Sequence, residues 1–401
     1  MILSPCPEPG KEARIILPAS KSISNRVLVA AKLAGIDLNT IDGLSESDDT
    51  RQLFEALESD CKTNLCIKDG AAPLRFLLAY RAAKNLPCTI QCGERLLQRP
   101  IQPMINSLKS MGAEIELMQN TLILHKGISG FSEVEIEASQ SSQFGSAFML
   151  IAPLFPGEKK IRLTGTIASA TYLQMTAKVL KEFGIDSVID GTEIRISYGA
   201  YLPQKIQIEK DWSAAAFIYA LVAVFDGPET IISGLSEDSL QGDIQVTEIF
   251  RELGVETIFT ANGIIIRKTG SVKRYINFDF EDCPDLAPPV LTACAALEID
   301  VKIRGLENLR FKESDRIDAL KSNLNKFGKD LKQDGECWIL ESKLPMPSGL
   351  IQIDDYNDHR IAMAFSVFTR MNNIQIQNPD CVNKSFPGFW KECKPWFNME
   401  L

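Results

Sequence analysis

Hydrophobic residues repeat along the chain at helical spacing, then at the shorter spacing of strands. One stretch shows the pattern clearly, because its apolar residues follow one another at steps of three and four: Ile317, Leu320, Leu324 and Phe327. This spacing places them on one face of a predicted helix. Gly328 follows, and glycine takes the left-handed conformation that ends many helices at little cost. A strand, a turn and a second strand are predicted to come next.

The same unit occurs four times at nearly constant spacing. Each copy reads as an apolar residue, a glycine, any residue and an acid, with the glycines at Gly112, Gly184, Gly254 and Gly328. A predicted turn follows each copy, and several of these turns are dipeptides that tight hairpins prefer: Gln119-Asn120, Asp190-Gly191, Asn262-Gly263 and Asp334-Gly335. Any α/β chain produces some helix–glycine–strand junctions by chance. The constant spacing instead favours repeated α/β units, with room for six, grouped into two domains.

Composition narrows the class of protein. The chain has 401 residues, 45% of them hydrophobic, and a net charge of −9. This charge argues against nucleic-acid or anionic-membrane partners, although a local cleft can still attract an anion. No apolar run reaches the length of a membrane span, and the first residues do not resemble a signal peptide. Ten scattered cysteines and two histidines make a metal site unexpected, so we predict reduced thiols in a cytoplasmic protein.

The first half of the chain contains three polar segments, of which the first and third open predicted helices and the second holds an arginine before a rigid proline. They are Lys21-Ser22-Ile23-Ser24-Asn25-Arg26, Arg95-Leu96-Leu97-Gln98-Arg99-Pro100 and Ser141-Ser142-Gln143-Phe144. Backbone N–H groups at a helix start attract anions, and basic or hydroxyl side chains there would add to that attraction. The alternative is ordinary helix capping beside solvated charges.

The second half carries further charged segments. They are Cys283-Pro284-Asp285-Leu286, Asn308-Leu309-Arg310-Phe311-Lys312-Glu313-Ser314-Asp315-Arg316, Asn357-Asp358-His359-Arg360 and Lys384-Ser385-Phe386-Pro387. Lys312 and Arg316 share a face if this stretch is helical, and Glu313 beside them is either a tuned acid or half of a salt bridge. Solvated charge runs and a structural histidine are the plain alternatives. No single segment decides between these interpretations.

Taken together and in this order, the segments resemble the enolpyruvyl transferase family, in particular its branch that acts on shikimate 3-phosphate. The motifs that carry the resemblance run from Lys21 to Pro387. They are Lys21-Ser22-Ile23-Ser24-Asn25-Arg26, Gln241-Gly242-Asp243, Lys312-Glu313-Ser314-Asp315-Arg316, Asp358-His359-Arg360 and Lys384-Ser385-Phe386-Pro387. The resemblance implies transfer of the enolpyruvyl group of phosphoenolpyruvate to the 5-hydroxyl of shikimate 3-phosphate, with release of phosphate.

The resemblance also implies a fold, which agrees with the repeat. We expect an α/β protein built as a two-domain inside-out α/β barrel, each domain made of three βαβαββ units. One domain would be discontinuous, from residues 1–20 and 241–401, and residues 21–240 would form the other. The active site would lie in the cleft between them.

Site residues follow from the resemblance, motif by motif. Shikimate 3-phosphate would be bound by Lys21, Ser22, Arg26, Ser141, Ser142, Gln143, Ser169, Tyr172, Asp285, Asn308 and Lys312. Phosphoenolpyruvate would be bound by Lys21, Arg99, Gln143, Arg316, Arg360 and Lys384. Seven of these residues are cations, which fits anionic substrates in an acidic protein. No metal or organic cofactor is implied, the only partners would be these small molecules, and we expect a monomer.

The chemistry requires two proton transfers. The 5-hydroxyl must lose a proton as it attacks C2 of phosphoenolpyruvate, and the methylene C3 must gain one. We assign Asp285 as the base at the hydroxyl and Glu313 as the acid at C3. Lys21 is the alternative in either step. The arginines would hold carboxylate and phosphate groups by paired hydrogen bonds.

One loop departs from the family pattern. The family has a phosphate-contacting loop reading roughly Asn-Ala-Gly-Thr-Ala-Met-Arg, and the corresponding stretch here is Lys68-Asp69-Gly70-Ala71-Ala72-Pro73-Leu74-Arg75. Aligned without a gap, Ala71-Ala72 replaces the glycine and threonine; aligned on Gly70, about two residues are missing. We therefore expect weaker phosphoenolpyruvate binding and reduced sensitivity to glyphosate, which occupies this region in the family.

Two other functions stay open at this stage. One is a non-catalytic homologue that binds shikimate 3-phosphate but has lost turnover through the altered loop. The other is the related transferase that acts on UDP-N-acetylglucosamine, whose family carries a reactive loop cysteine and a lysine-asparagine motif near its start. The Lys21-Ser22 pair and the positions of the cysteines disfavour that second alternative.

Overall fold

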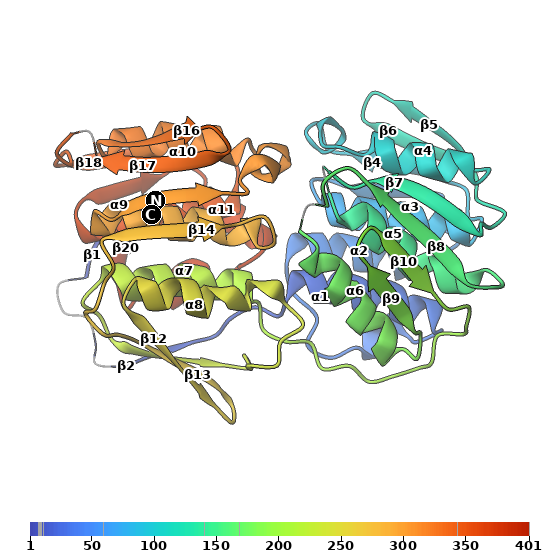
Figure 1. The fold of residues 1–401 in the computed structure, drawn as a ribbon, viewed down its shortest axis with the longest axis horizontal. Helices are drawn as coiled ribbons and strands as arrows, with labels where there is room; N and C mark the ends of the chain where they lie inside the picture. Colours follow the sequence, from blue (N-terminus) through green and yellow to red (C-terminus); the bar gives the residue numbers. More distant parts are fainter. Residues whose placement is uncertain are drawn as a thin grey trace. The chain divides into compact units, whose positions relative to one another are not determined.

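A computed structural model describes residues 1–6, 10, 12–58, 60–139, 141–167, 169–342 and 344–400. The chain forms two compact units, shown in Figure 1. The discontinuous unit contains Met1–Pro18 and Glu209–Leu401, and the continuous unit contains Ala19–Ile208. The sequence placed residues 209–240 with the continuous unit. In the structure they belong to the discontinuous one, because strand β11 (Glu229–Ser233) pairs with β2 (Glu12–Ile15) and lies beside β13 (Gly263–Lys268).

The discontinuous unit contains three four-stranded sheets. Their strand orders are β18-β19-β1-β20, β12-β13-β11-β2 and β14-β15-β17-β16. Besides β2, β11 and β13, these sheets contain β1 (Ile2–Pro5), β12 (Val255–Thr260), β14 (Tyr275–Asp279), β15 (Asp300–Arg304), β16 (Lys329–Asp334), β17 (Cys337–Ser342), β18 (Leu350–Ile353), β19 (Asn373–Ile376) and β20 (Phe397–Glu400). The first sheet joins the two ends of the chain, because β1 pairs with β20.

Six α-helices and five 3-10 helices belong to the described part of this unit. The α-helices are α7 (Trp212–Val224), α8 (Val246–Glu252), α9 (Ala287–Leu297), α10 (Arg316–Lys326), α11 (His359–Phe365) and α12 (Phe389–Glu392). The 3-10 helices are η4 (Gly242–Gln245), η5 (Pro284–Leu286), η6 (Glu307–Phe311), η7 (Ser366–Arg370) and η8 (Pro379–Lys384).

The continuous unit contains two four-stranded sheets within its described residues, ordered β3-β4-β6-β5 and β7-β8-β10-β9. The strands are β3 (Asn64–Ile67), β4 (Cys88–Cys92), β5 (Glu114–Met118), β6 (Thr121–Lys126), β7 (Glu133–Glu137), β8 (Lys159–Thr164), β9 (Ser187–Asp190) and β10 (Glu193–Ile196). The helices are α1 (Lys21–Leu33), η1 (Leu38–Thr40), α2 (Asp48–Glu58), α3 (Ala71–Ala83), η2 (Leu96–Gln98), α4 (Gln102–Ser110), α5 (Gln143–Ile151), η3 (Ala152–Leu154) and α6 (Thr171–Glu182).

All five sheets share one topology, which confirms the predicted repeat. In each, a parallel pair of strands is followed by two antiparallel pairings: β14 runs parallel to β15, for example, and β15 and β16 both run antiparallel to β17. The α/β prediction is therefore confirmed, although the sheets are separate and no closed barrel forms among the described residues.

The four repeat glycines end helices as predicted. Gly112, Gly184, Gly254 and Gly328 all have φ between 71° and 93°, and each directly follows the C-cap residue of α4, α6, α8 or α10. A Cβ on Gly328 would lie 2.5 Å from the backbone oxygen of Leu344, so both conformation and space select glycine there.

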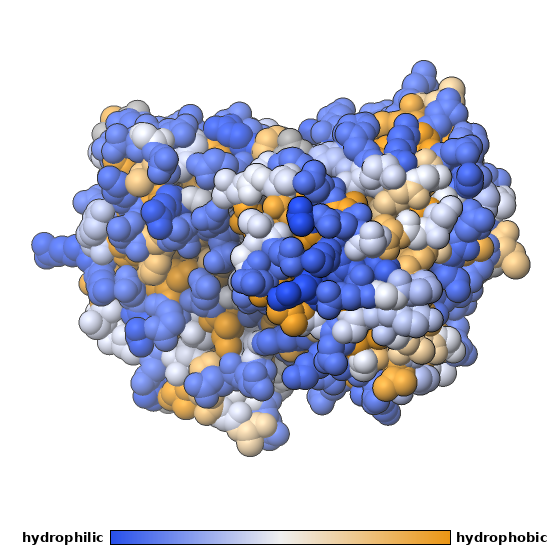
Figure 2. Space-filling model, turned by 45° about the vertical axis from the view of Figure 1, so that its right-hand side comes forward, coloured by the Kyte–Doolittle hydropathy of each residue, from blue (hydrophilic) through white to orange (hydrophobic). Residues whose placement is uncertain are grey.

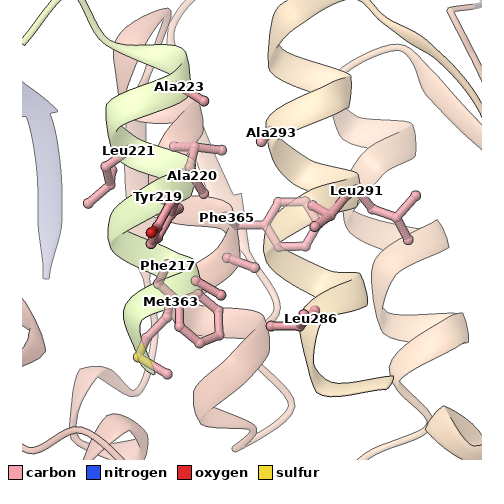
Figure 3. Packing of buried hydrophobic residues seen from close by; sticks show 14 of the residues in the cluster. Phe217, Tyr219, Ala220, Leu221, Ala223, Leu286, Leu291, Ala293, Met363 and Phe365 are labelled. Atoms are coloured by element: carbon pink, nitrogen blue, oxygen red, sulfur yellow. The ribbon is translucent and has the colours of Figure 1, made fainter. Parts of the chain in front are cut away.

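The core of the discontinuous unit is centred on α7, whose sequence is apolar on every side. Twelve of its thirteen residues are buried, which is typical of a helix that packs on all faces rather than one. Figure 3 shows α7 beside α9 and α11, with Phe365 directed into the space between α7 and α9. Loss of such a buried ring costs about 3–5 kcal/mol, so this packing fixes the helices whose first residues form the site described below.

Hydrophilic residues cover most of the face drawn in Figure 2, with hydrophobic residues interspersed among them. Among the described helices, none has both the length and the apolar character to cross a membrane. The described residues also contain no group of three His, Cys, Asp or Glu side chains arranged to hold a metal ion. All ten cysteines are free thiols.

Candidate active site

Most of the predicted residues of the discontinuous unit converge at the starts of its helices. Arg316 opens α10, and Arg360 lies in the first turn of α11. Both helices are capped by aspartates: Asp315 accepts the backbone N–H groups of Ile317 and Asp318, and Asp358 accepts that of Arg360. These caps fix where each helix begins, and so where each arginine projects. We call the following residues the 285–384 cluster: Asp285, Lys312, Glu313, Arg316, Asp358, Arg360 and Lys384.

Arg316 is the hub of this cluster. Its side chain is 1% exposed, and its guanidinium contacts three carboxylates. Nε lies 2.8 Å from Asp358 Oδ2, Nη1 lies 3.0 Å from Asp285 Oδ1, and Nη2 lies 2.7 Å from Glu313 Oε2. These acids raise the pKa of Arg316 even though burial alone would lower it. Arg316 therefore stays charged and holds the two predicted proton carriers in fixed positions.

Asp285, in η5, is surrounded by cations. Besides Arg316, Lys312 Nζ lies 3.4 Å from Oδ1 and Arg360 Nη2 lies 2.9 Å from Oδ2. Burial acts to raise the pKa of Asp285, but the three cations outweigh it and hold this pKa well below its ordinary value. Burial lowers the pKa of Lys312. Without substrates, Asp285 is thus a stable anion that neutralises the surrounding cations.

Glu313 lies between two cations. Its Oε2 accepts from Arg316, and its Oε1 lies 3.5 Å from Lys384 Nζ at the end of η8. Asn308 lies in η6, one turn before Lys312. The cluster can hold anionic groups on its cations and exchange protons on its carboxylates.

Asp243 lies in η4 and belongs to the motif Gln241-Gly242-Asp243. Its buried carboxylate accepts a hydrogen bond from Ser213 Oγ. Burial and the negative charge of Asp285 raise the pKa of Asp243 to about 7, against the opposing effect of Arg360. The native protein therefore binds a proton here that the unfolded chain, with an ordinary aspartate, releases at lower pH.

This difference predicts how stability changes with pH. Between about pH 4 and 7, ionisation of Asp243 favours the unfolded state, so its contribution to stability falls as pH rises through that window. Asp243→Asn removes the ionisation, and we expect it to raise the melting temperature relative to the parent more at pH 8 than at pH 5. The effect should be a few kcal/mol at most. Asp238→Asn, at an exposed carboxylate, is the control; an equal response of both variants at both pH values would contradict the assignment.

In the continuous unit, the predicted Lys21 opens α1. Ser20 caps the helix, and Lys21 Nζ lies 3.1 Å from Asp49 Oδ2 on α2. Asp49 is 5% exposed at its side chain. The ammonium group therefore lies at the positive end of a helix beside a buried carboxylate, a position from which it can reach an anion or carry a proton.

Arg26 is buried one turn further along α1. It donates to Thr176 Oγ1 (2.7 Å), to Ser146 Oγ (3.0 Å) and to the backbone oxygens of Ser22 and Tyr172. These oxygens are all neutral, and burial lowers the pKa of Arg26 to about 10. Arg26 thus ties the start of α6, where Tyr172 lies, to the start of α1.

Ser141, Ser142 and Gln143 lie at the start of α5. Arg75, from α3, donates to Ser141 Oγ (2.9 Å) and to Gln143 Oε1 (2.7 Å), and also to the backbone oxygen of Pro100, next to Arg99. Its guanidinium lies 4.5 Å from the centre of the Phe144 ring. Ser169 comes just before α6 with a φ of 58°, a conformation that is uncommon for serine.

The altered loop leads directly into α3. Gly70 is the N-cap and gives no side-chain cap, and the helix begins at Ala71. A Cβ on Gly70 would lie 2.7 Å from Pro73 Cγ and 2.9 Å from Asp49 Oδ1, so the loop packs closely against the partner of Lys21. Ala71 is buried.

Sequence reasoning missed three residues of these groups. Asp49 and Arg75 were not assigned, and Asp358 was quoted only within a motif. A signal existed for Arg75, which ends the loop already aligned with the family pattern. Asp49 stands in an acidic run, Ser47-Asp48-Asp49, that is typical of any helix start, so only its contact with Lys21 distinguishes it.

Comparison with known proteins gives consistent matches. The sequence model of the family described as EPSP synthase (3-phosphoshikimate 1-carboxyvinyltransferase) matches residues 57–393. A 3-phosphoshikimate 1-carboxyvinyltransferase of Bacteroides fragilis is 36% identical over 397 residues, covering 96% of this chain and 95% of the relative. One of Dehalococcoides mccartyi is 33% identical over 401 residues, covering 94% of each chain.

Solved structures agree on the fold. An EPSP synthase from Acinetobacter baumannii matches with a TM-score of 0.75 at 20% identity, covering 98% of this chain and 97% of that one. The enolpyruvyl transferase NikO from Streptomyces tendae matches with a TM-score of 0.72 at 11% identity, covering 98% and 96%. At these identities the likeness supports the architecture rather than the substrate.

Proposed function

The chain belongs to the EPSP synthase family, and from this premise we propose how its own residues carry out the reaction. The protein is a transferase of the shikimate pathway, which serves aromatic amino-acid biosynthesis. It transfers the enolpyruvyl group of phosphoenolpyruvate to shikimate 3-phosphate. The observation that carries the assignment of residues is the 285–384 cluster, where four cations surround the two predicted proton carriers.

Substrate binding is divided between the two units in this proposal. Shikimate 3-phosphate is bound by the hydroxyls and cations of the continuous unit together with Asp285, Asn308 and Lys312. Phosphoenolpyruvate is bound by Arg316, Arg360 and Lys384 with Lys21, Arg99 and Gln143. Arginine pairs suit carboxylate and phosphate groups because their N–H groups match two oxygens at once.

The first step is addition. The 5-hydroxyl oxygen forms a bond to C2 of phosphoenolpyruvate while Asp285 accepts the hydroxyl proton, and Glu313 gives a proton to C3. Asp285 is a weak base while three cations surround it. Bound phosphate and carboxylate groups draw on the same cations, which raises the pKa of Asp285 toward that of a working base.

The second step is elimination. The bond from C2 to the phosphate oxygen breaks and phosphate leaves with its electron pair, taking up the proton that Asp285 had accepted. C3 returns the added proton to Glu313 to restore the double bond. The arginines stabilise the charge that gathers on the departing phosphate. Lys21 is the alternative proton carrier in either step, because its ammonium group lies at the start of α1 beside the buried carboxylate of Asp49.

Release of inorganic phosphate tests the proposal. Phosphate release from the purified protein should require both substrates and should be lost in Lys21→Ala and Glu313→Ala. Binding of shikimate 3-phosphate without any release by the parent protein would instead support the non-catalytic homologue. That alternative rests on the loop at residues 68–75, where the family pattern is altered.

The same loop predicts an inhibitor response. The buried Cβ of Ala71 occupies the place of a family glycine in the ungapped alignment, which reduces room for a ligand against the backbone. We expect glyphosate to inhibit weakly, and Ala71→Gly to lower the inhibitory concentration about tenfold or more. Titration of glyphosate into the phosphate-release assay gives the inhibitory concentration for the parent and for Ala71→Gly. Tight inhibition of the parent, competitive with phosphoenolpyruvate, would contradict the expectation.

We further propose that the protein acts as a cytoplasmic monomer. Its ten cysteines are free thiols, as expected in a reducing compartment, and one chain supplies every residue assigned above. Light scattering should give the mass of a single chain, 44.5 kDa; twice that mass would contradict it.

A further inference from the structure

The turn between β18 and α11 has an unusual backbone. Tyr356 and Asn357 are consecutive, and both lie in the left-handed region, with φ of 54° and 55°. Non-glycine residues rarely adopt this conformation, and a pair of them persists only where the surroundings enforce it. The turn, residues 354–357, comes just before Asp358 and Arg360 of the 285–384 cluster.

One enforcing contact comes from Asp355, whose carboxylate is buried. Its Oδ1 accepts the backbone N–H of Asn357 at 2.9 Å, and its Oδ2 accepts that of Asn378 at 2.7 Å. Asn378 also donates from Nδ2 to Asn357 Oδ1 at 2.7 Å. Asn378 is the N-cap of η8, which ends in Lys384. Asp355 therefore connects the turn to the segment that carries Lys384.

A second contact comes from α10. Asn323 is fully buried, and its amide pairs with the backbone of Asp354 in both directions: Oδ1 accepts from the N–H at 3.0 Å and Nδ2 donates to the carbonyl at 2.9 Å. Lys326 Nζ adds an ion pair of 2.7 Å to the Asp354 carboxylate. Because α10 begins at Arg316, these contacts connect the turn to the hub of the cluster.

The turn also sets the start of α11. The backbone N–H of Asp358 donates to the Asp355 carbonyl at 2.8 Å, and Asp358 then caps the helix at Arg360 and binds Arg316. Three segments, which carry Arg316, Arg360 and Lys384 respectively, are thus hydrogen-bonded to the same four residues. Like charges repel, so a fixed frame is needed to hold such groups in one place.

We propose that residues 354–357 form a positioning frame that sets the mutual placement of Arg316, Arg360 and Lys384, with Asp355 and Asn323 as its positioning residues. The inference rests on the proposed role of these three cations in binding phosphoenolpyruvate. Arg316, Arg360 and Lys384 are assigned to phosphoenolpyruvate alone, whereas most residues assigned to shikimate 3-phosphate, among them Asn308 in η6 and Lys312 directly after it, lie in other segments. Loosening the frame should therefore affect the two substrates unequally.

The test compares the KM for phosphoenolpyruvate, measured by phosphate release, with the dissociation constant of shikimate 3-phosphate. Asp355→Ala removes both acceptor oxygens and should raise the KM for phosphoenolpyruvate about tenfold or more, because small displacements of binding groups are costly. The dissociation constant of shikimate 3-phosphate, from calorimetry, should stay within about twofold. Asp355→Asn keeps one acceptor oxygen and should recover part of the loss. Asn323→Ala should act in the same direction as Asp355→Ala.

Two further variants complete the test: one disturbs the frame without removing a buried group, and the other is a control. Asn378→Ala removes only the exposed side-chain contact to Asn357 and should still raise the KM for phosphoenolpyruvate about threefold, so the proposal stays testable if Asp355→Ala does not fold. Asp37→Ala removes a carboxylate that accepts the N–H of Asn39 in a turn of the other unit, and its kinetics should match the parent.

Two outcomes would overturn the frame. One is lower melting temperatures in Asp355→Ala and Asn378→Ala with an unchanged KM for phosphoenolpyruvate, which would mark a merely structural turn. The other is an equal loss of affinity for both substrates. Absence of phosphate release in the parent protein would instead count against the proposed function, so the two failures are distinguishable.

Discussion

Arg316→Met should destabilise the protein by about 3–5 kcal/mol and lower phosphate release by a factor of about 10²–10³ or more. The guanidinium is 1% exposed and contacts Asp285, Glu313 and Asp358. Methionine fills similar space but leaves Asp358 as a buried carboxylate without its main cation, and an uncompensated buried charge is strongly unfavourable. Urea unfolding measures the first effect and the phosphate assay the second.

Arg310→Met is the matched control. Arg310 also pairs with two carboxylates, Asp315 at 3.0 Å and Asp318 at 3.8 Å, but its side chain is 39% exposed. Exposed pairs contribute little, so we expect a change of no more than about 1 kcal/mol and normal turnover. Equal stability losses in the two variants would show that the buried network of Arg316 is not the source of the effect.

Glu313→Gln should lower kcat by about 10²–10⁴ while leaving substrate affinity nearly unchanged. Glutamine keeps the shape of the side chain and one oxygen for Arg316 but carries no proton to give to C3. Calorimetry should show binding of shikimate 3-phosphate within about threefold of the parent, since the ion pairs of Glu313 are with Arg316 and Lys384, which are assigned to phosphoenolpyruvate.

Glu307→Gln serves as the control for this change, because Glu307 is an exposed glutamate in the neighbouring η6. Its kinetics should match the parent. If Glu313→Gln instead raised the KM for phosphoenolpyruvate with an unchanged kcat, Glu313 would position Arg316 and Lys384, and Lys21 would become the leading acid.

The sequence alone determined the repeated α/β unit, because its signals are local. A helix face, the glycine after it and a hairpin turn are contained within about 30 residues, and each follows from conformational preferences of the residues themselves. Gly328 is a clear case, since its φ of 71° and the nearby Leu344 backbone both require glycine. The charged motifs were equally visible, and their resemblance to a family supplied the reaction.

The tertiary structure decided what the chain brings together across long separations. Strand β1 completes a sheet with β19 and β20 from the other end of the chain, and β2 pairs with β11, so residues 209–240 join the discontinuous unit rather than the continuous one. Such pairings depend on which surfaces bury each other, and no local pattern encodes that choice.

The candidate active site shows the same division between what local sequence specifies and what tertiary contacts specify. Lys312, Glu313 and Arg316 could be selected from their spacing, but the partners that fix their positions and charge come from elsewhere in the chain: Asp285, Asp358 and, through the frame, Asp355 and Asn323. Whether a carboxylate is a solvated surface charge or a buried partner of three cations depends on burial and distance. Sequence specifies the side chain, and only the folded chain specifies its surroundings.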